Sequence, residues 1–110
     1  MTTQDLLIKE EKNQAAVLTL NRPAVMNCLN FDLLYAVRDE IEALQFAEGI
    51  RSVIITGAGE KAFCAGADLK ERATLTPEQV KQFIVTIRNL LTAIGNLKMP
   101  LTAEITGIFR

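Results

Sequence analysis

An apolar run followed at once by a segment of small residues constrains this chain most. Val53–Thr56 is apolar on both faces and therefore predicts a strand in a sheet that is covered on both sides. The residues Cys64-Ala65-Gly66-Ala67-Asp68 predict a tight loop opening into a helix, where another molecule can approach the backbone closely. Because the first N–H groups of a helix lack partners, they can hold negative charge. We therefore expect a site built from main chain.

Apolar periodicity predicts further elements on both sides of this segment. Asn13-Gln14 marks a turn, Asn30 and Thr76 stand as caps ahead of two helical patterns, and Gly49 and Gly95 follow those patterns. The expected elements are a hairpin from Leu6 to Leu20, helices from Phe31 to Glu48 and from Pro77 to Gly95, and strands at Val53–Thr56 and Leu101–Ile105.

The two expected helices each have an apolar face. In the first helix the face consists of Leu33, Leu34, Val37, Ile41 and Leu44, and in the second it consists of Val80, Phe83, Ile84, Ile87, Leu91 and Ile94. The order strand, strand, helix, strand, helix, strand predicts an α/β or α+β fold with a strand–helix–strand crossover. With 110 residues, the chain is expected to form at most one domain.

Composition narrows the classes of function. The chain has no histidine, which excludes Ser–His and Cys–His nucleophile pairs and His-based metal sites. Its cysteines, Cys28 and Cys64, match no metal-binding spacing, so we expect no metal site and two reduced thiols. A net charge of −1 without a basic stripe predicts no nucleic-acid partner. No signal-type or membrane-spanning run is visible, and we expect a cytoplasmic protein without a membrane partner.

The small-residue loop has three readings from its residues alone. Gly57-Ala58-Gly59-Glu60-Lys61-Ala62 matches the dinucleotide pattern in its G-x-G-x-x-A form, but the residues after it continue a helix poorly. The second reading is an oxyanion hole, in which a backbone N–H near Gly66-Ala67-Asp68 meets a developing negative charge. The third is a tight turn that packs against a neighbouring segment.

Two motifs, in order, resemble the enoyl-CoA hydratase/isomerase family, also called the crotonase family. They are the segment Leu20–Asn30, which contains Asn21-Arg22-Pro23, and the segment Phe63–Ala73, which is similar to the methylglutaconyl-CoA hydratase branch. The resemblance covers the whole chain but only the N-terminal part of the family's domain. It implies a ββα spiral fold and assembly as trimers or hexamers.

The resemblance also implies roles for particular residues. The N–H of Ala67 would be one oxyanion donor to the thioester carbonyl of an acyl-CoA substrate. Coenzyme A would enter as part of that substrate, with no separate cofactor. The residues implied to contact it are Arg22, Pro23, Ala24, Met26, Ala65, Gly66, Asp68, Leu69 and Lys70. For Asp68 and Arg22, a helix cap and a surface charge are the alternatives.

The chain departs from the family near its end. Glu104 and Thr106 stand where the family typically has a small apolar residue and an asparagine. The second oxyanion donor, in a glycine-rich loop, and both catalytic glutamates lie in the family beyond Gly107. We therefore expect residues 1–110 to be a partial crotonase-like domain that is inactive by itself.

Three functions follow from these observations. The first is the N-terminal part of an enzyme of fatty acid metabolism that adds water to 2-enoyl-CoA through a stabilised enolate. The second is a non-catalytic remnant that binds coenzyme A or forms oligomers with full-length relatives. RNA binding, known in the methylglutaconyl branch, is the third. The acidic residues of the first helix oppose it, since they repel phosphate.

Overall fold

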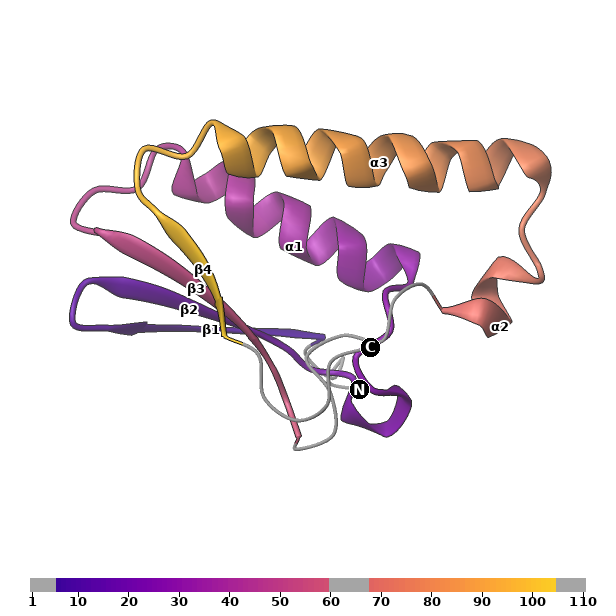
Figure 1. The fold of residues 1–110 in the computed structure, drawn as a ribbon, viewed down its shortest axis with the longest axis horizontal. Helices are drawn as coiled ribbons and strands as arrows, with labels where there is room; N and C mark the ends of the chain where they lie inside the picture. The colour runs from indigo at the N-terminus through magenta and orange to yellow at the C-terminus, as the bar shows by residue number, and fades with distance from the viewer. Residues whose placement is uncertain (1–5, 60–67, 105–110) are drawn as a thin grey trace, which may run out of the picture.

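A sheet with two long helices on one of its faces frames the molecule (Figure 1). The computed structural model describes residues 6–59 and 68–104. Within them the sheet has the order β1-β2-β3-β4. β1 and β2 are antiparallel, whereas β2, β3 and β4 run parallel, which confirms the α/β prediction and the strand–helix–strand crossover. The elements are β1 (Leu7–Lys12), β2 (Ala15–Leu20), η1 (Pro23–Val25), α1 (Phe31–Leu44), β3 (Ser52–Gly57), α2 (Leu69–Arg72), α3 (Pro77–Gly95) and β4 (Leu101–Glu104).

The hairpin between β1 and β2 closes through a two-residue turn. Asn13 and Gln14 have φ values of 51° and 67°, the left-handed pair that a type I′ turn requires. The turn sets the register in which Lys12 lies opposite Ala15 and Leu7 lies opposite Leu20. The predicted turn is confirmed, although Gln14 occupies a position that favours glycine.

Helix α1 begins as predicted and ends earlier than predicted. The side chain of Asn30 accepts a hydrogen bond from the Leu33 N–H at 2.9 Å, which confirms the cap. At the other end, the amides of Gln45, Phe46 and Ala47 donate to carbonyls three residues back. This tightening ends the α-helix at Leu44, whereas the sequence predicted its end at Glu48.

Helix α3 begins with a complete capping box. The Gln79 N–H donates to the Thr76 hydroxyl at 3.2 Å, and the Thr76 N–H donates to the Gln79 side chain at 2.9 Å. Pro77 occupies the first turn, where its missing N–H costs nothing. Both predicted ends of this helix are confirmed.

The core lies between one face of the sheet and the two long helices. Alternate residues of β2 and β3 point into it, because side chains along a strand alternate between faces. Five residues of α1 complete its centre, and they are the apolar face that was predicted for that helix. The buried core residues are Ala16, Leu18, Leu20, Leu33, Leu34, Val37, Ile41, Leu44, Val53, Ile55, Phe83, Leu90 and Met99.

The predicted apolar face of α3 differs from the face that it buries. Phe83, Thr86 and Leu90 are buried, whereas Ile84 and Leu91 are 52% and 62% exposed. The apolar stripe of α3 is wider than the surface that α1 covers. One flank of the stripe is therefore left outside the core within the described residues.

The opposite face of the sheet was also expected to be covered. Val17 lies beside Ile54, and Ile54 lies beside Thr102, in neighbouring strands. Val17 and Ile54 are half-buried, and both long helices lie on the other side of the sheet (Figure 1). Within the described residues the long helices therefore cover one face of the sheet, and the expected cover of the second face stays a prediction.

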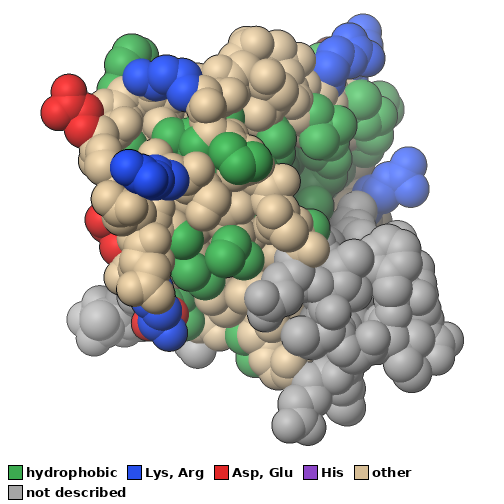
Figure 2. All heavy atoms as spheres, turned by 60° about the vertical axis from the view of Figure 1, so that its left-hand side comes forward, with side chains coloured by type: hydrophobic (Ala, Val, Ile, Leu, Met, Phe, Trp, Pro, Cys, Tyr) green, Lys and Arg blue, Asp and Glu red, His purple; other side chains and the backbone are tan. Residues whose placement is uncertain are grey.

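Charged side chains are dispersed over the surface. Lys9 pairs with Glu40 at 3.2 Å, and Arg38 pairs with Asp39 at 3.0 Å. On the face shown in Figure 2, the described Lys and Arg side chains stand apart from one another between polar and hydrophobic groups. Among the described residues, no helix combines the length and apolar character needed to cross a membrane.

Candidate functional site

The candidate site lies where the parallel strands β2 and β3 end. Leu20 and Gly57, the last residues of these strands, are partners in the register, and the Ala58 N–H donates to the Leu20 carbonyl at 2.8 Å. The connection after β2 contains η1, and the connection after β3 leads to α2. In open α/β sheets, ligands bind outside the carboxyl ends of the strands.

The structure describes only part of the predicted site. Ala65, Gly66 and Ala67 lie outside the described residues, so the oxyanion donor at Ala67 stays a prediction. The other predicted residues gather at one end of the sheet: Arg22, Pro23, Ala24 and Met26 lie in or beside η1, and Asp68, Leu69 and Lys70 lie at the start of α2. The roles predicted for them toward coenzyme A also stay predictions.

Asn27 joins the two connections, and it was missed in the sequence. It is fully buried and has a φ of 57°, a left-handed conformation that asparagine tolerates better than most residues. Its side-chain oxygen accepts from the Arg22 N–H at 2.8 Å, and its side-chain nitrogen donates to the Ala58 carbonyl at 3.0 Å. Asn27 thus holds the chain just after β3 against the segment that follows β2.

Arg22 fixes the other end of the same connection. One of its guanidinium nitrogens, Nη2, donates to Oδ2 of Asp68 at 3.0 Å, and Nη1 donates to the Cys28 carbonyl at 2.5 Å. The two side chains are only 17% and 16% exposed, so this ion pair is better shielded from water than a surface pair. The Asp68 N–H also donates to the Leu29 carbonyl at 2.8 Å. Ala58 and Asp68 are therefore each joined to the segment 22–29.

Asp68 also caps α2. Its Oδ1 accepts from the N–H groups of Lys70 and Glu71 at 3.0 and 3.1 Å. The hydrogen bond from the Glu71 N–H, followed by that from the Arg22 guanidinium, holds the pKa of Asp68 below its ordinary value of 3.8, against the opposing effect of burial. The carboxylate is therefore ionised and engaged by both of its oxygens. The helix cap considered in the sequence analysis is confirmed.

Glu71 ties α2 to α1. Its Oε1 accepts from the Phe31 N–H at 2.9 Å, which satisfies an N–H that the first turn of α1 leaves without a helical partner. No sequence signal identified this long-range contact, because Glu71 reads as an exposed residue of a short helix. It belongs to the framework of the site.

Gly59 passes very close to Pro23. Its φ is 84°, and a Cβ atom added there would lie 3.2 Å from the Cβ of Pro23. Both the conformation and the contact favour glycine at this position. A tight turn packed against a neighbouring segment is thus present at Gly59. The turn and oxyanion readings of the sequence concern Gly66 and Ala67, which lie outside the described residues, so both stay predictions.

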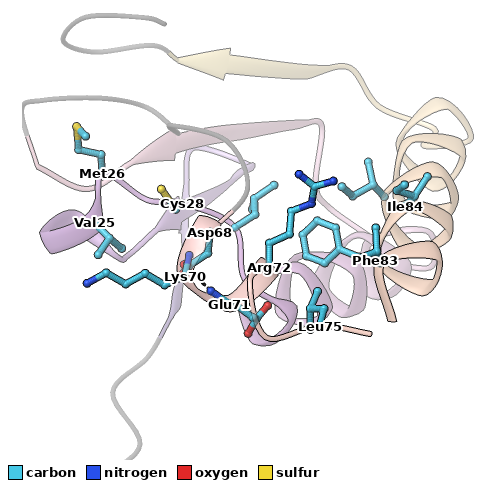
Figure 3. Close-up of a pocket in the computed structure, with 13 residues that line it drawn as sticks. Val25, Met26, Cys28, Asp68, Lys70, Glu71, Arg72, Leu75, Phe83 and Ile84 are labelled. Atoms are coloured by element: carbon cyan, nitrogen blue, oxygen red, sulfur yellow. Dashed lines mark hydrogen bonds between the residues drawn. The ribbon is translucent and has the colours of Figure 1, made fainter. Parts of the chain in front are cut away.

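A cavity of about 700 Å³ opens between α2, α3 and the segment after β2. Figure 3 shows side chains from these three segments around it. Most of its wall is apolar, and four charged residues of the α2 region line one side. The lining residues are Val25, Met26, Cys28, Leu29, Asp68, Lys70, Glu71, Arg72, Leu75, Val80, Phe83, Ile84 and Ile87. An apolar cleft of this size with a few polar groups is typical of small-molecule sites.

The arrangement differs from a metal centre. Within residues 6–59 and 68–104, no cluster of three or more Asp, Glu, Cys or His side chains could hold a metal ion. Cys28 is a free thiol at the cavity. The described part of the site can therefore hold an apolar group beside Asp68 and the start of α2.

Comparison with known proteins places this geometry in a family. The sequence model of the enoyl-CoA hydratase/isomerase family matches residues 10–109. YngF of Bacillus subtilis, an enoyl-CoA hydratase/isomerase homologue, is 40% identical over 102 residues, which span 93% of this chain and 39% of YngF. Mouse mitochondrial methylglutaconyl-CoA hydratase is 37% identical over 101 residues, spanning 92% of this chain and 32% of that protein.

Solved structures agree with the sequence comparisons. The crystal structure of enoyl-CoA hydratase from Bacillus anthracis matches with a TM-score of 0.89 and 36% identity, over 94% of this chain and 40% of that one. The fold is therefore the N-terminal part of a crotonase fold, as the resemblance implied. This chain spans about two fifths or less of the length of the relatives named here. With its family model, relatives and fold in agreement, the chain belongs to the enoyl-CoA hydratase/isomerase family.

Proposed function

We propose that this chain forms the N-terminal wall of an acyl-CoA site in an enoyl-CoA hydratase/isomerase-type enzyme. The observation that supports it is an apolar cavity lined by Asp68, whose N–H and carboxylate are held by Leu29 and Arg22. Met26, Asp68 and Lys70 line that cavity, and all three were expected to contact the coenzyme A thioester. Arg22 already serves Asp68 and the Cys28 carbonyl, so its contact with coenzyme A would use its remaining donors.

The proposed chemistry is the addition of water to a 2-enoyl thioester. As water adds to the β-carbon, negative charge develops on the thioester oxygen, and the N–H of Ala67 would donate to it. Losing one such donor typically costs about 10²–10³ in rate. Asp68 contributes by fixing the residue next to this donor, because its own N–H and carboxylate are held by Leu29 and Arg22. Coenzyme A takes part only as a portion of the substrate.

Binding and turnover of crotonyl-CoA test this proposal separately. Titration calorimetry on the 110-residue chain is expected to detect crotonyl-CoA binding, whereas a hydration assay is expected to detect no turnover. The A67P variant removes the proposed N–H donor and should weaken crotonyl-CoA binding more than binding of free coenzyme A. Absence of any binding would overturn the proposed site, and turnover at the level of the full-length relatives would overturn the proposed inactivity.

A second candidate is a non-catalytic remnant that associates with other chains. The exposed flank of α3, formed by Ile84 and Leu91, supports it, because exposed apolar patches often mark interfaces. A trimeric or hexameric assembly and a cytoplasmic location belong to our proposal as well. Sedimentation of the chain, alone and with a full-length relative, tests the association. A compact monomer in both experiments would exclude this second candidate.

A further inference from the structure

Helix α2 is too short to set its own direction. It contains four residues, Leu69–Arg72, and a single helical turn is unstable without outside contacts because it fixes several residues for few hydrogen bonds. The two long-range contacts of Asp68, with Leu29 and with Arg22, both lie at the start of this helix. Attachment at one end alone would let α2 pivot, so a second contact is needed to fix its direction.

Glu71 provides that second contact. Its Oε1 accepts from the Phe31 N–H at 2.9 Å, and its own N–H donates to Oδ1 of Asp68, three positions earlier, at 3.1 Å. The segment that leads into α1 is therefore joined to α2 at two separate points, Leu29 with Asp68 and Phe31 with Glu71. Two such points fix the direction of α2 relative to α1.

Phe31 is itself held against the core. It is the first residue of α1, a helix of 14 residues whose start is also capped by Asn30. Its ring packs edge-on against that of Phe83, with 5.0 Å between the ring centroids, and lies 5.6 Å from the ring of Tyr35. Through Glu71, the short helix α2 therefore takes its direction from a long helix whose apolar face is buried.

The direction of α2 matters for the proposed oxyanion donor. Ala67, whose N–H is proposed for this role, directly precedes Asp68 in the chain and lies outside the described residues. A donor stabilises a developing charge only when it is already oriented toward it, and a hydrogen bond weakens steeply as it bends. A pivot of α2 about Asp68 would alter the orientation of the peptide groups that adjoin Asp68.

From these contacts we infer that Glu71 is a positioning residue of the proposed site. By accepting from the Phe31 N–H, it fixes α2 against α1 and so keeps the N–H of Ala67 oriented toward the thioester oxygen. The inference rests on the proposed function. Glu71 also lines the cavity, but its Oε1 is engaged by Phe31, so it acts through α2 rather than on the ligand. This role does not depend on which acyl group is bound.

Amide hydrogen exchange of the ligand-free chain tests the contact itself. The Arg72 N–H donates to the Asp68 carbonyl at 2.9 Å and therefore exchanges when α2 opens. We expect E71A to speed this exchange about fivefold, the effect of one lost hydrogen bond. E71Q retains an acceptor oxygen and should stay close to the wild type. Should E71A fail to fold, E71D, which is one methylene shorter, is expected to speed the exchange less.

The matched control is E78A, which removes an exposed carboxylate from the first turn of α3. It should leave the exchange of the Arg72 amide unchanged. Equal exchange rates in E71A and E78A would overturn the inference, and circular dichroism confirms that each variant is folded.

Binding of crotonyl-CoA and of free coenzyme A tests the link to Ala67. The measurement is the ratio of the two dissociation constants, by calorimetry, for the wild-type chain, E71A, E71Q, A67P and the double variant E71A/A67P. We expect E71A to weaken crotonyl-CoA binding about fivefold relative to free coenzyme A, and E71Q to leave the ratio close to that of the wild type. The double variant should show the same ratio as A67P, because two changes that act on one donor are not additive.

The possible results separate this inference from the proposed function. If crotonyl-CoA does not bind the wild-type chain, the proposed function fails, and the role of Glu71 toward Ala67 fails with it. If crotonyl-CoA binds but E71A leaves the ratio unchanged, only the role of Glu71 is overturned. Additive losses in E71A and A67P would also overturn it, because Glu71 would then act on the ligand independently of Ala67.

Discussion

At the scale of single residues, a few side chains each hold two segments together. Asp68 uses one carboxylate oxygen for Arg22 and the other for the start of α2. The side-chain oxygen of Asn27 accepts a hydrogen bond from the Arg22 N–H, and its side-chain nitrogen donates one to the Ala58 carbonyl. Removing either side chain therefore affects more than one contact, so single substitutions here are informative.

Substituting Asp68 should change how stability depends on pH. The folded-state pKa of Asp68 lies below 3.8, so the unfolded chain takes up this proton first as pH falls. The stabilisation by the carboxylate is therefore fully present above pH 3.8 and is lost as pH falls through the lowered pKa. We expect D68N to lower the urea midpoint at neutral pH and to flatten the loss of stability below pH 3.8.

The control for this experiment is D39N, which removes a carboxylate from an exposed pair with Arg38. The side chain of Asp39 is 65% exposed, so its pair should contribute little. If D39N and D68N had equal effects on the urea midpoint at neutral pH, the shielded Arg22 pair would have no special role.

Alanine substitutions at three glycines distinguish the cost of a positive φ from the cost of a close contact. G59A combines a φ of 84° with a contact of 3.2 Å to Pro23, G49A has a φ of 81° and open space, and G95A has neither. We expect G59A to destabilise the chain most, by about 2 kcal/mol, G49A to cost about 1 kcal/mol, and G95A to be neutral or stabilising. Thermal and urea unfolding measure all three. Equal losses of unfolding free energy in G59A and G49A would show that Pro23 moves away from the added methyl group without a measurable energetic penalty.

At the scale of elements, local signals predicted the starts of helices better than their buried faces. The caps at Asn30 and Thr76 depend on residues three positions apart, so the sequence alone contains them. The buried face of α3 depends on the elements packed against it, which bury Thr86 and Leu90 but leave Leu91 exposed. Periodicity identifies an apolar stripe, and only the neighbouring element decides which part of it is covered.

In the site, too, the sequence contained the local signals but not the contacts between distant segments. Arg22 and Asp68 stood out in the sequence as parts of two motifs, but their mutual contact joins residues 46 positions apart. Asn27 and Glu71 belong to the same two motifs, but the sequence predicted no role for them, because their contacts depend on Ala58 and Phe31 from other elements. The cavity was also beyond prediction, since its wall combines three segments. The motifs identified the segments, and the fold determined how they meet.

The β1–β2 turn can be improved by one substitution. Gln14 has a φ of 67° as the second residue of the turn, where Asn-Gly is the preferred pair. We expect Q14G to raise the free energy of unfolding by about 0.5–1 kcal/mol, because glycine relieves the left-handed strain. Urea unfolding measures this. A destabilised Q14G would mean that the added freedom of the unfolded chain outweighs the relief.

At the scale of the whole molecule, the sheet has two unlike faces. Leu18 is fully buried against the helices, whereas its neighbour Val17 points to the other face and is half-buried. We expect L18A to cost about 3 kcal/mol of unfolding free energy and V17A about 1 kcal/mol or less. Urea unfolding at two protein concentrations provides the comparison. An equal cost for V17A would mean that another chain or segment covers the second face.

The two edges of the sheet are unlike as well. β1 carries Lys9, Glu10, Glu11 and Lys12 along one edge, whereas β4 begins with Leu101, Thr102 and Ala103. Charged residues keep an edge strand from pairing with foreign strands. In the described part of the chain, the charged β1 edge therefore disfavours pairing with a further strand, whereas the β4 edge allows it. A strand that extends the sheet, whether from the same polypeptide or another, is expected to pair with β4.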